Sequence, residues 1–227
     1  MTAPPTDTDT PELPTLDPGV TLLDADERVT GALQSLVLDH VLLEGGRGTW
    51  LDANGHATTS PMARLAPSMR ALDRIDVARA FTPWQHQSLL FGTPGFVDED
   101  TVLLVLPAFD AFYREDDLRR GEGEAMLDAG LDIVEALADE HEVPILLTRE
   151  RADSFSQPIH DLADEVLECE RTRFGPRFSG GEFETLVYPL ENGDVQTTLA
   201  FWERVLQDRH AALVESPQPE VSLGGTY

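Results

Sequence analysis

The stretch that decides the fold is Thr101-Val-Leu-Leu-Val-Leu106, which is followed by an amphipathic run over residues 122–141 and by Pro144-Ile-Leu-Leu-Thr148. Short, uninterrupted apolar runs are typical of strands that are buried on both faces of a parallel sheet. The run between them has apolar residues at helical spacing and is long enough to carry the chain from one parallel strand to the next. The three segments therefore predict a strand–helix–strand unit of an α/β fold.

The segments on either side continue this alternation. Toward the amino terminus, the pattern predicts strands and helices in turn, at Val20–Ala25, Gly31–Leu43, Gly48–Ala53, Arg64–Leu72, Ile75–Phe81 and Gln85–Phe91. Toward the carboxyl terminus the apolar period becomes two, which predicts an antiparallel meander at Val166–Arg173, Phe183–Pro189 and Thr197–Phe201. We therefore expect a mostly parallel twisted sheet with helices on both faces and an antiparallel C-terminal extension.

The polar ends of the chain suggest the domain boundaries. Residues 1–18 are rich in proline and threonine and predict a disordered leader, while residues 215–227 predict a flexible tail. No apolar run has the length that a signal peptide or a membrane span requires. The single cysteine, Cys169, allows no internal disulfide. We expect one core domain, residues 19–214, in a soluble cytoplasmic protein.

The charge composition is extreme, because 42 acidic residues stand against 16 basic residues and every basic residue is arginine. The formal net charge is −26. Acidity without lysine predicts a halophilic origin, since at multimolar salt the Debye length falls to about 3 Å and surface self-repulsion is nearly erased. Such acidity also argues against simple electrostatic binding of nucleic acid, which needs a basic surface. The six histidines lack metal-binding spacing, so no metal site is expected.

Several segments resemble the ATPase core of RecA/RadA-type recombinases. In chain order they are the third-strand signature (72–81 with 85–90), the Walker B strand and the segment after it (101–106, 109–114 and 119–121), the next helix and strand (138–148), and the closing meander (160–164 and 167–173). The similarity extends over residues 19–206. It implies a RecA-like three-layer fold and a paralogue similar to RadA or RadB.

The phosphate-binding loop of that family departs from its pattern here. A P-loop, G-x-x-x-x-G-K-[ST], wraps backbone N–H groups around phosphates and adds a lysine, and this chain has no lysine. In the matching alignment Asp24 and Val29 replace the two glycines, Thr30 replaces the lysine, and Gly31 replaces the magnesium-binding hydroxyl. The acidic side chains of this stretch would repel a triphosphate.

The remaining catalytic positions are altered as well. Pro107 stands where the Walker B aspartate is expected, with Asp110 three residues further on, and Asn54 stands at the catalytic glutamate. The polar sensor after the strand at 144–148 reads Arg149-Glu-Arg151. A magnesium nucleotide site needs a phosphate cradle, a metal ligand and a water-orienting base together. The resemblance therefore implies a pseudo-ATPase with no cofactor.

Candidate partner contacts come from one tryptophan and a few arginines. Trp84, at the start of a predicted helix, is the candidate for a partner-facing aromatic, whereas Trp50 and Trp202 fit the core. Arg119 and Arg120 lie among acidic residues, in a loop that either caps the long helix as a solvated turn or contacts DNA. Arg149 and Arg151 are further candidates for DNA or partner contact.

The preferred function at this stage is an accessory or regulator of DNA recombination and repair that acts through a protein partner, such as a recombinase. Direct DNA contact has weaker support. One alternative is an ATP-binding RecA-family ATPase with a site rebuilt from arginines such as Arg28 or Arg47. Another is a RecA-like regulatory or structural protein outside DNA repair, for example in division or motility, because a fold does not decide a function.

Overall fold

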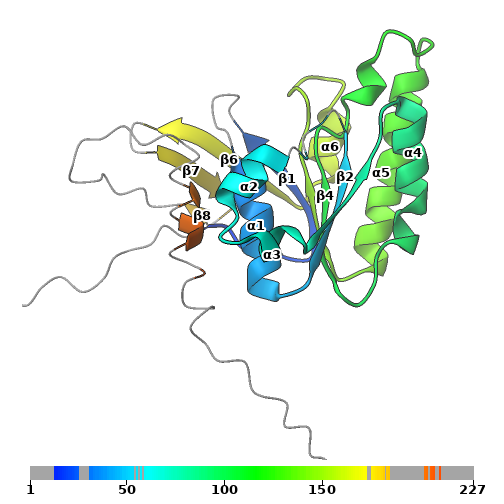
Figure 1. Cartoon of the computed structure of the whole chain (residues 1–227). Coiled ribbons are helices and arrows are strands. Elements are labelled where there is room, and N and C mark those ends of the chain that lie inside the picture. Colours follow the sequence, from blue (N-terminus) through cyan, green and yellow to red (C-terminus); the bar gives the residue numbers. More distant parts are fainter. Residues whose placement is uncertain are drawn as a thin grey trace, which may run out of the picture.

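The computed structural model describes residues 13–25, 31–53, 55, 57, 59–172, 175–181, 183–184, 202–203, 205–207 and 210. These residues form one sheet with helices on both faces (Figure 1). The strands are β1 (Gly19–Ala25), β2 (Arg47–Asp52), β3 (Ile75–Arg79), β4 (Thr101–Leu106), β5 (Pro144–Leu147), β6 (Glu165–Thr172), β7 (Gly175–Gly180) and β8 (Phe183–Glu184). The helices are α1 (Ala32–Glu44), α2 (Thr59–Leu65), α3 (Met69–Leu72), α4 (Pro83–Gly92), α5 (Glu122–Glu140) and α6 (Gln157–Leu162), with short 3₁₀ turns η1 (Thr93–Gly95) and η2 (Phe112–Arg114).

The sheet has the strand order β3-β2-β4-β5-β1-β6-β7-β8. Strands β1 to β6 run parallel to their neighbours in this order. Strands β7 and β8 are antiparallel and continue the sheet beyond β6. The predicted combination of a mostly parallel sheet and an antiparallel C-terminal extension is therefore confirmed.

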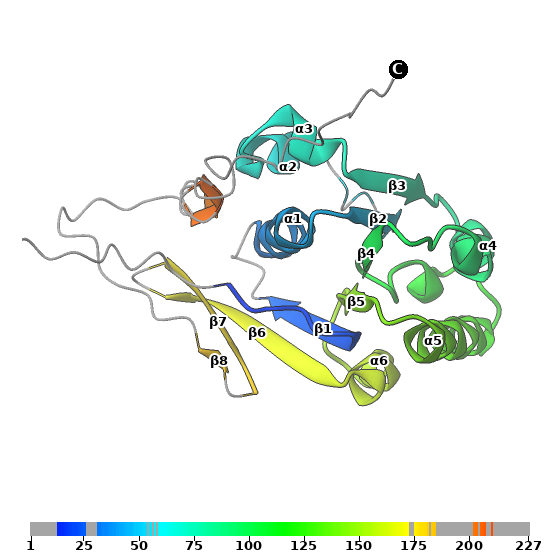
Figure 2. The same ribbon diagram turned by 90° about the horizontal axis from the view of Figure 1, so that it is seen from below.

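Two apolar cores lie on the two sides of the sheet. Helices α1, α2 and α3 cover one face, and helices α4, α5 and α6 cover the other (Figure 2). Alternate residues of β4 enter the two cores, with Leu103 and Val105 on the α1 side and Leu104 and Leu106 on the α5 side. This two-sided burial is the reason why the stretch lacks polar residues. The α1-side core also includes Leu13 and Leu16, so it reaches back before the predicted boundary at residue 19.

Some elements differ from the prediction. The helix expected at Arg64–Leu72 is wrong, because two short helices, α2 and α3, flank Pro67. Proline disfavours helical backbone at the residue before it and lacks the N–H that a continuing helix needs. Strand β7, which begins and ends with glycine, and helix α6 were not predicted. In the expected strand Phe183–Pro189, only the residues of β8 are described, and the strand expected at 197–201 lies outside the described residues.

Candidate functional site at the carboxyl ends of the central strands

The candidate site lies where β1 and β5 are neighbours in the sheet. Helix α1 leaves the end of β1 toward one face, whereas α6 leaves the end of β5 toward the other face (Figure 2). Open α/β sheets bind ligands outside the carboxyl ends of their strands at such a switch point.

Among the described residues, none of the helices combines the length and the hydropathy that a membrane span requires.

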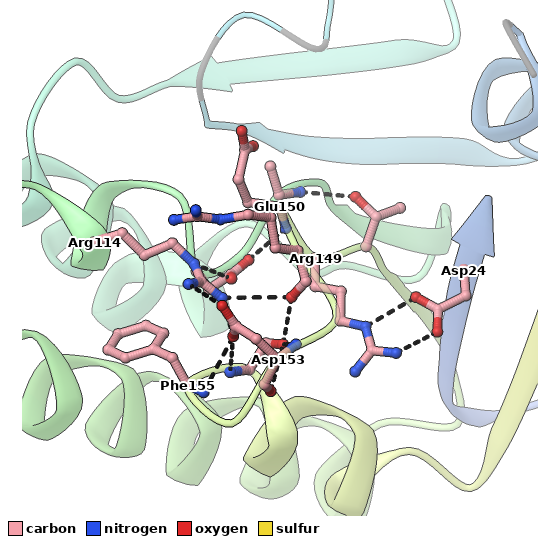
Figure 3. Close-up of polar contacts among 11 residues, drawn as sticks. Asp24, Arg114, Arg149, Glu150, Asp153 and Phe155 are labelled. Atoms are coloured by element: carbon pink, nitrogen blue, oxygen red, sulfur yellow. Dashed lines mark hydrogen bonds and ion pairs between the residues drawn. The ribbon is translucent and has the colours of Figure 1, made fainter. Parts of the chain in front are cut away.

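An ion pair between Asp24 and Arg149 connects the ends of β1 and β5 at this switch point. Asp24 lies near the end of β1, and Arg149 follows the end of β5, so the parallel pairing of the two strands brings the residues together. The Arg149 Nε donates to the Asp24 Oδ1 at 2.9 Å, and a second guanidinium nitrogen donates to Oδ2 (Figure 3). Such a two-point contact is among the strongest that a carboxylate makes. The sequence alignment placed Asp24 at a P-loop position, where its charge would repel a phosphate. In the structure this charge is compensated by Arg149 of the same chain.

The turn after β4 is tied to the end of β5. Pro107 follows the strand, and Ala108 takes a left-handed conformation with φ of 45°, which reverses the chain. The Ala108 N–H donates to the Thr148 Oγ1 at 2.8 Å, and the Phe109 N–H donates to the Thr148 carbonyl at 2.9 Å. The φ value is unusual for a residue other than glycine, and these two hydrogen bonds hold it in place. Phe109 and Asp110, the two residues after Ala108, are both fully buried.

Asp110 is fully buried, and each of its carboxylate oxygens accepts a hydrogen bond. Oδ1 accepts a hydrogen bond from the Glu150 N–H at 2.6 Å, and Oδ2 accepts one from the Arg114 Nε at 2.5 Å. A carboxylate must present free lone pairs to bind a magnesium ion. A metal ion at Asp110 would have to share these oxygens with the Arg114 guanidinium and the Glu150 N–H, which already compensate the buried charge. In this conformation Asp110 ties the turn after β4 to the loop after β5.

Arg114 joins the turn to the loop after β5. Its two terminal nitrogens donate to Asp153 at 2.9 and 2.7 Å, while its guanidinium carbon lies 4.7 Å from the centre of the Phe155 ring. The Asp153 contact, foremost, raises the pKa of Arg114. In return, hydrogen bonding from Arg114 holds the pKa of Asp153 well below its usual range. Arg114 therefore stays charged and holds the 148–156 loop against the turn that contains Asp110.

A second carboxylate–arginine pair lies at the end of β2. Asp52 is fully buried and accepts the Arg79 Nε at 2.7 Å and the Ala57 N–H at 2.6 Å. The register of β2 and β3 places Asp52 directly opposite Arg79. Sequence reasoning missed this pair, because a register between strands that are far apart in the chain leaves no local signal. Asn54, the predicted counterpart of the catalytic glutamate, lies outside the described residues.

The other predicted site residues are spread over the molecule. Of the P-loop positions, Gly31 precedes α1 with φ of 88°, while Val29 and Thr30 lie outside the described residues. Arg149 is turned inward to Asp24, with only 9% of its side chain exposed, and so is not presented to DNA or a partner. The remaining candidates are exposed: Trp84, Arg119, Arg120 and Arg151. Trp50 and Trp202 are fully buried, as predicted.

A buried polar pair that the sequence did not indicate lies between α4 and η2. The His86 Nδ1 is 2.8 Å from the Tyr113 hydroxyl, and the rings of Phe109 and Phe112 pack around the imidazole. Burial lowers the pKa of His86 to about 4 and raises the pKa of Tyr113. Both side chains therefore stay neutral at physiological pH. Lone polar residues in an apolar pattern carry no sign of which partner will satisfy them.

The aspartates at the carboxyl ends of β1, β2 and β4 are paired within the chain. Asp24, Asp52 and Asp110 each accept a hydrogen bond from an arginine, and no group of three or more potential ligands among the described residues is placed to hold a metal ion. General acid–base or metal chemistry needs a group that can exchange a proton or accept a ligand. These contacts tie the loop after β5 to the end of β1 and to the turn after β4.

No family model matches the chain, and no curated protein matches it.

Proposed function

We propose that this protein is a non-catalytic, RecA/RadA-like paralogue that regulates DNA recombination or repair through protein contacts. The observation that carries the proposal is the Asp24–Arg149 ion pair at the switch point of the sheet. A P-loop protein would need this space for backbone N–H groups, a lysine and the phosphates. Here one carboxylate and one guanidinium of the chain itself take it up.

The state of Asp110 supports the same conclusion. It is the carboxylate nearest in sequence to the predicted Walker B position, and it is the natural candidate to replace the missing aspartate at Pro107. Its two oxygens are held by Arg114 and the Glu150 N–H. Releasing one of them would leave a buried charge partly unpaired, which costs several kcal/mol, on the order of 3–5. Magnesium-dependent hydrolysis is therefore disfavoured at two independent positions.

The arrangement of the matching segments supports the RecA-like part of the proposal. The third-strand segment corresponds to β3 at the sheet edge, the Walker B segment to β4, and the next matching strand to β5. The closing segments, 160–164 and 167–173, correspond to the end of α6 and to β6, and β6 forms the first antiparallel pair of the sheet with β7. Segments that the resemblance identifies separately along the chain thus belong to one sheet.

The rebuilt ATPase has less support. Arg47, one of the arginines considered for it, begins β2 and pairs with Asp76, so it lies at the amino end of its strand, away from the switch point. Arg28 lies outside the described residues. Arg149 is the arginine that does reach the switch point, and its guanidinium is committed to Asp24.

Isothermal titration of the purified protein with Mg-ATP tests the proposal, in about 2 M KCl so that surface charge is screened. We expect no heat of binding up to millimolar nucleotide. Micromolar binding would overturn the pseudo-ATPase. Repeating the titration with Arg149→Gln would then show whether Arg149 itself holds the nucleotide, as a rebuilt site requires.

A second experiment addresses the pathway. The tagged protein is used to capture partners from its native host at high salt, with mass spectrometry as the readout. Recovery of a recombinase or repair protein supports the proposal. If repeated captures recover only proteins of other processes, such as division or motility, the role in recombination is wrong.

A further inference from the structure

The surface around helix α4 combines exposed aromatic rings with an absence of charge. Seven large apolar side chains among the described residues are exposed, and four of them lie here: Phe81, Trp84, Phe91 and Phe96, by 71%, 52%, 62% and 50%. Residues 80–97 contain no aspartate, glutamate or arginine, although 26% of the chain is charged. Exposed aromatic groups gathered in one place mark an interaction site more often than single exposed apolar residues do.

On α4 itself, two aromatic rings flank a small residue. Trp84 and Phe91 lie on the same side of the helix, since residues seven apart are separated by about two turns, and Ser88 lies between them. The Ser88 Oγ donates to the Trp84 carbonyl at 2.8 Å, so this hydroxyl is satisfied within the helix. Along its axis the exposed side of α4 is therefore large, small and large, with no charge that a covering surface would have to compensate.

Phe81 and Phe96 extend the apolar surface beyond the two ends of the helix. The Phe81 N–H donates to the Gln85 side chain at 2.9 Å, which ties Phe81 to the first turn. Phe96 follows the turn η1, and its ring lies 3.5 Å from the position of a Cβ added to Gly92. Figure 2 shows α4 at the outer edge of the molecule, beside the edge strand β3. We call five residues the α4 face: Phe81, Trp84, Ser88, Phe91 and Phe96.

The acidic residues of the neighbouring helix α5 lie away from the α4 face. Gly130 of α5 packs against the buried side of α4, since a Cβ added to Gly130 would lie 3.2 Å from a methyl group of Leu90. Five exposed carboxylates lie on the side of α5 that is turned away from Gly130: Glu124, Asp128, Asp132, Glu135 and Asp139. This line of carboxylates therefore does not border the α4 face.

We propose that the α4 face is an interface between two copies of this chain, with Ser88 of both copies close to a two-fold axis. A two-fold axis across a helix turns the helix end for end, so Trp84 lies beside Phe91 of the partner subunit, and the reverse contact is made as well. The small Ser88 at the centre allows the two helices to approach to the usual packing distance of about 8–10 Å. This inference goes beyond the proposed function and does not depend on it.

Charge and area both fit a second copy. Each copy carries a net charge of −26, and like charges placed opposite each other are costly, so two copies need a surface without carboxylates in order to meet. The four rings expose about 500 Å² on one copy, at about 200 Å² for a whole aromatic side chain, and about 1,000 Å² on two copies. This area is close to the lower bound of about 1,000 Å² for a specific interface. We therefore expect a dimer that dissociates on dilution.

The segments of the chain outside the described residues fit the α4 face less well. Residues 1–12 contain a single large apolar residue, Met1. Residues 185–201 connect β8 to Trp202, which packs on β7, and both strands lie at the end of the sheet remote from β3. Residues 211–227 follow His210, which pairs with helix α1 on the opposite face of the sheet (Figure 2). A tail of the same chain would cover the α4 face at any concentration, whereas a second copy covers it only when two copies meet.

Dilution of the full chain in about 2 M KCl is the first test, with sedimentation velocity and tryptophan fluorescence as readouts. Trp50 and Trp202 are fully buried, so Trp84 is the one of the three tryptophans that solvent reaches. From about 5 μM to about 500 μM we expect monomer to give way to dimer. Over the same range the Trp84 emission should shift to shorter wavelength and become protected from iodide. Monomer at every concentration, or protection of Trp84 that does not change with concentration, would overturn the proposal.

Variants separate the α4 face from the rest of the surface. Ser88→Glu places two like charges at the axis, and Trp84→Ala combined with Phe91→Ala removes the two rings of the helix. Each should weaken dimerisation by about tenfold or more, as loss of an interface centre does. The matched controls are Ala63→Glu, at an exposed position of α2, and Met69→Ala, an exposed apolar residue of α3, and both should dimerise as the wild type. Circular dichroism checks that every variant is folded.

A cysteine at the axis tests the symmetry of the contact. Cys169, the single cysteine of the chain, is buried, so Ser88→Cys provides one exposed thiol. Because a residue on a two-fold axis meets its own copy, a short bismaleimide should link two Ser88→Cys chains into a covalent dimer. Ala63→Cys, treated at the same concentration, should stay monomeric. Equal linking of the two variants, equal loss of dimer in the control variants, or a dimer in which Ser88→Cys fails to link would each overturn the proposed interface.

Discussion

Acidification below pH 6.5 should destabilise the protein through His86. The imidazole is fully buried, its Nδ1 lies 2.8 Å from the Tyr113 hydroxyl, and its Nε2 has no hydrogen-bond partner within the described residues. Burial lowers the pKa of His86 from 6.5 to about 4, since a protonated ring would lose its hydration and find aromatic rings around it. Tyr113, whose pKa is raised by burial, stays neutral throughout this range.

The direction and size of the effect follow from the two pKa values. Between pH 6.5 and 4 the unfolded chain binds a proton at His86 and the folded chain does not, so the free energy of unfolding falls as the pH falls. A difference of 2.5 pKa units between 6.5 and about 4 corresponds to about 3 kcal/mol in total. About 2 kcal/mol of this should be lost between pH 6.5 and 4.5. Below about pH 4 the contribution levels off.

The assay compares urea unfolding at pH 6.5 and 4.5, followed by circular dichroism in about 2 M KCl. His86→Phe removes the titrating group and keeps an aromatic ring in the space. It should be less stable than the wild type at pH 6.5, because the Tyr113 hydroxyl loses its partner, yet it should lose about 2 kcal/mol less on acidification. His160→Gln, at an exposed position, is the control and should behave as the wild type. Equal acid sensitivity of His86→Phe and the wild type would refute the reasoning.

Further measurements test the site, the surface and the charge. Arg114→Ala leaves the buried Asp110 carboxylate without its cation and should lower the free energy of unfolding in urea by about 3–5 kcal/mol, whereas Arg151→Ala, at an exposed position, should stay within about 0.5 kcal/mol. Trp84→Ala should also change the free energy of unfolding by no more than about 0.5 kcal/mol, and a larger loss would mean that Trp84 contributes to the core rather than only to the surface. Circular dichroism in dilute buffer should show partial or full unfolding that about 2 M KCl reverses, and a stable fold at low salt would contradict the halophilic prediction.

The strand–helix–strand alternation was predictable because it rests on local pattern. The run at Thr101–Leu106 is apolar at every position that two cores bury, and the length of α5 fits its predicted bounds to one residue. Strand β7 was not predicted, because its own sequence disfavours a strand. Gly175–Gly180 contains a proline and two glycines, which lower strand propensity, yet pairing with β6 holds it as β7. Tertiary pairing of this kind outweighs intrinsic preference and leaves no signal in the segment itself.

The site was predictable in place but not in its contacts. Asp24 and Arg149 were each singled out, one as a lost glycine and the other as an altered sensor, but nothing in the sequence showed that they would meet across 125 residues. The same holds for Arg114, whose partners Asp110 and Asp153 lie in different loops. Which charges compensate one another depends on strand order and register. Without strand order and register, the sequence predicts uncompensated carboxylates at the carboxyl ends of the strands. In the structure, Asp24, Asp52 and Asp110 are each paired with an arginine.

All basic residues of the chain are arginines, and this matters at the carboxyl ends of the strands. Each of the buried or half-buried carboxylates at the ends of β1, β2 and β4 is held by a guanidinium nitrogen donor, from Arg149, Arg79 and Arg114 respectively. A planar guanidinium can hold two oxygens at once and stays charged when buried, whereas a lysine is a single point charge that is readily neutralised by burial. A lysine in a P-loop must remain available to an incoming phosphate. Arginines paired in this way, such as Arg149 with Asp24, are committed to carboxylates of the chain and are not available to an incoming phosphate.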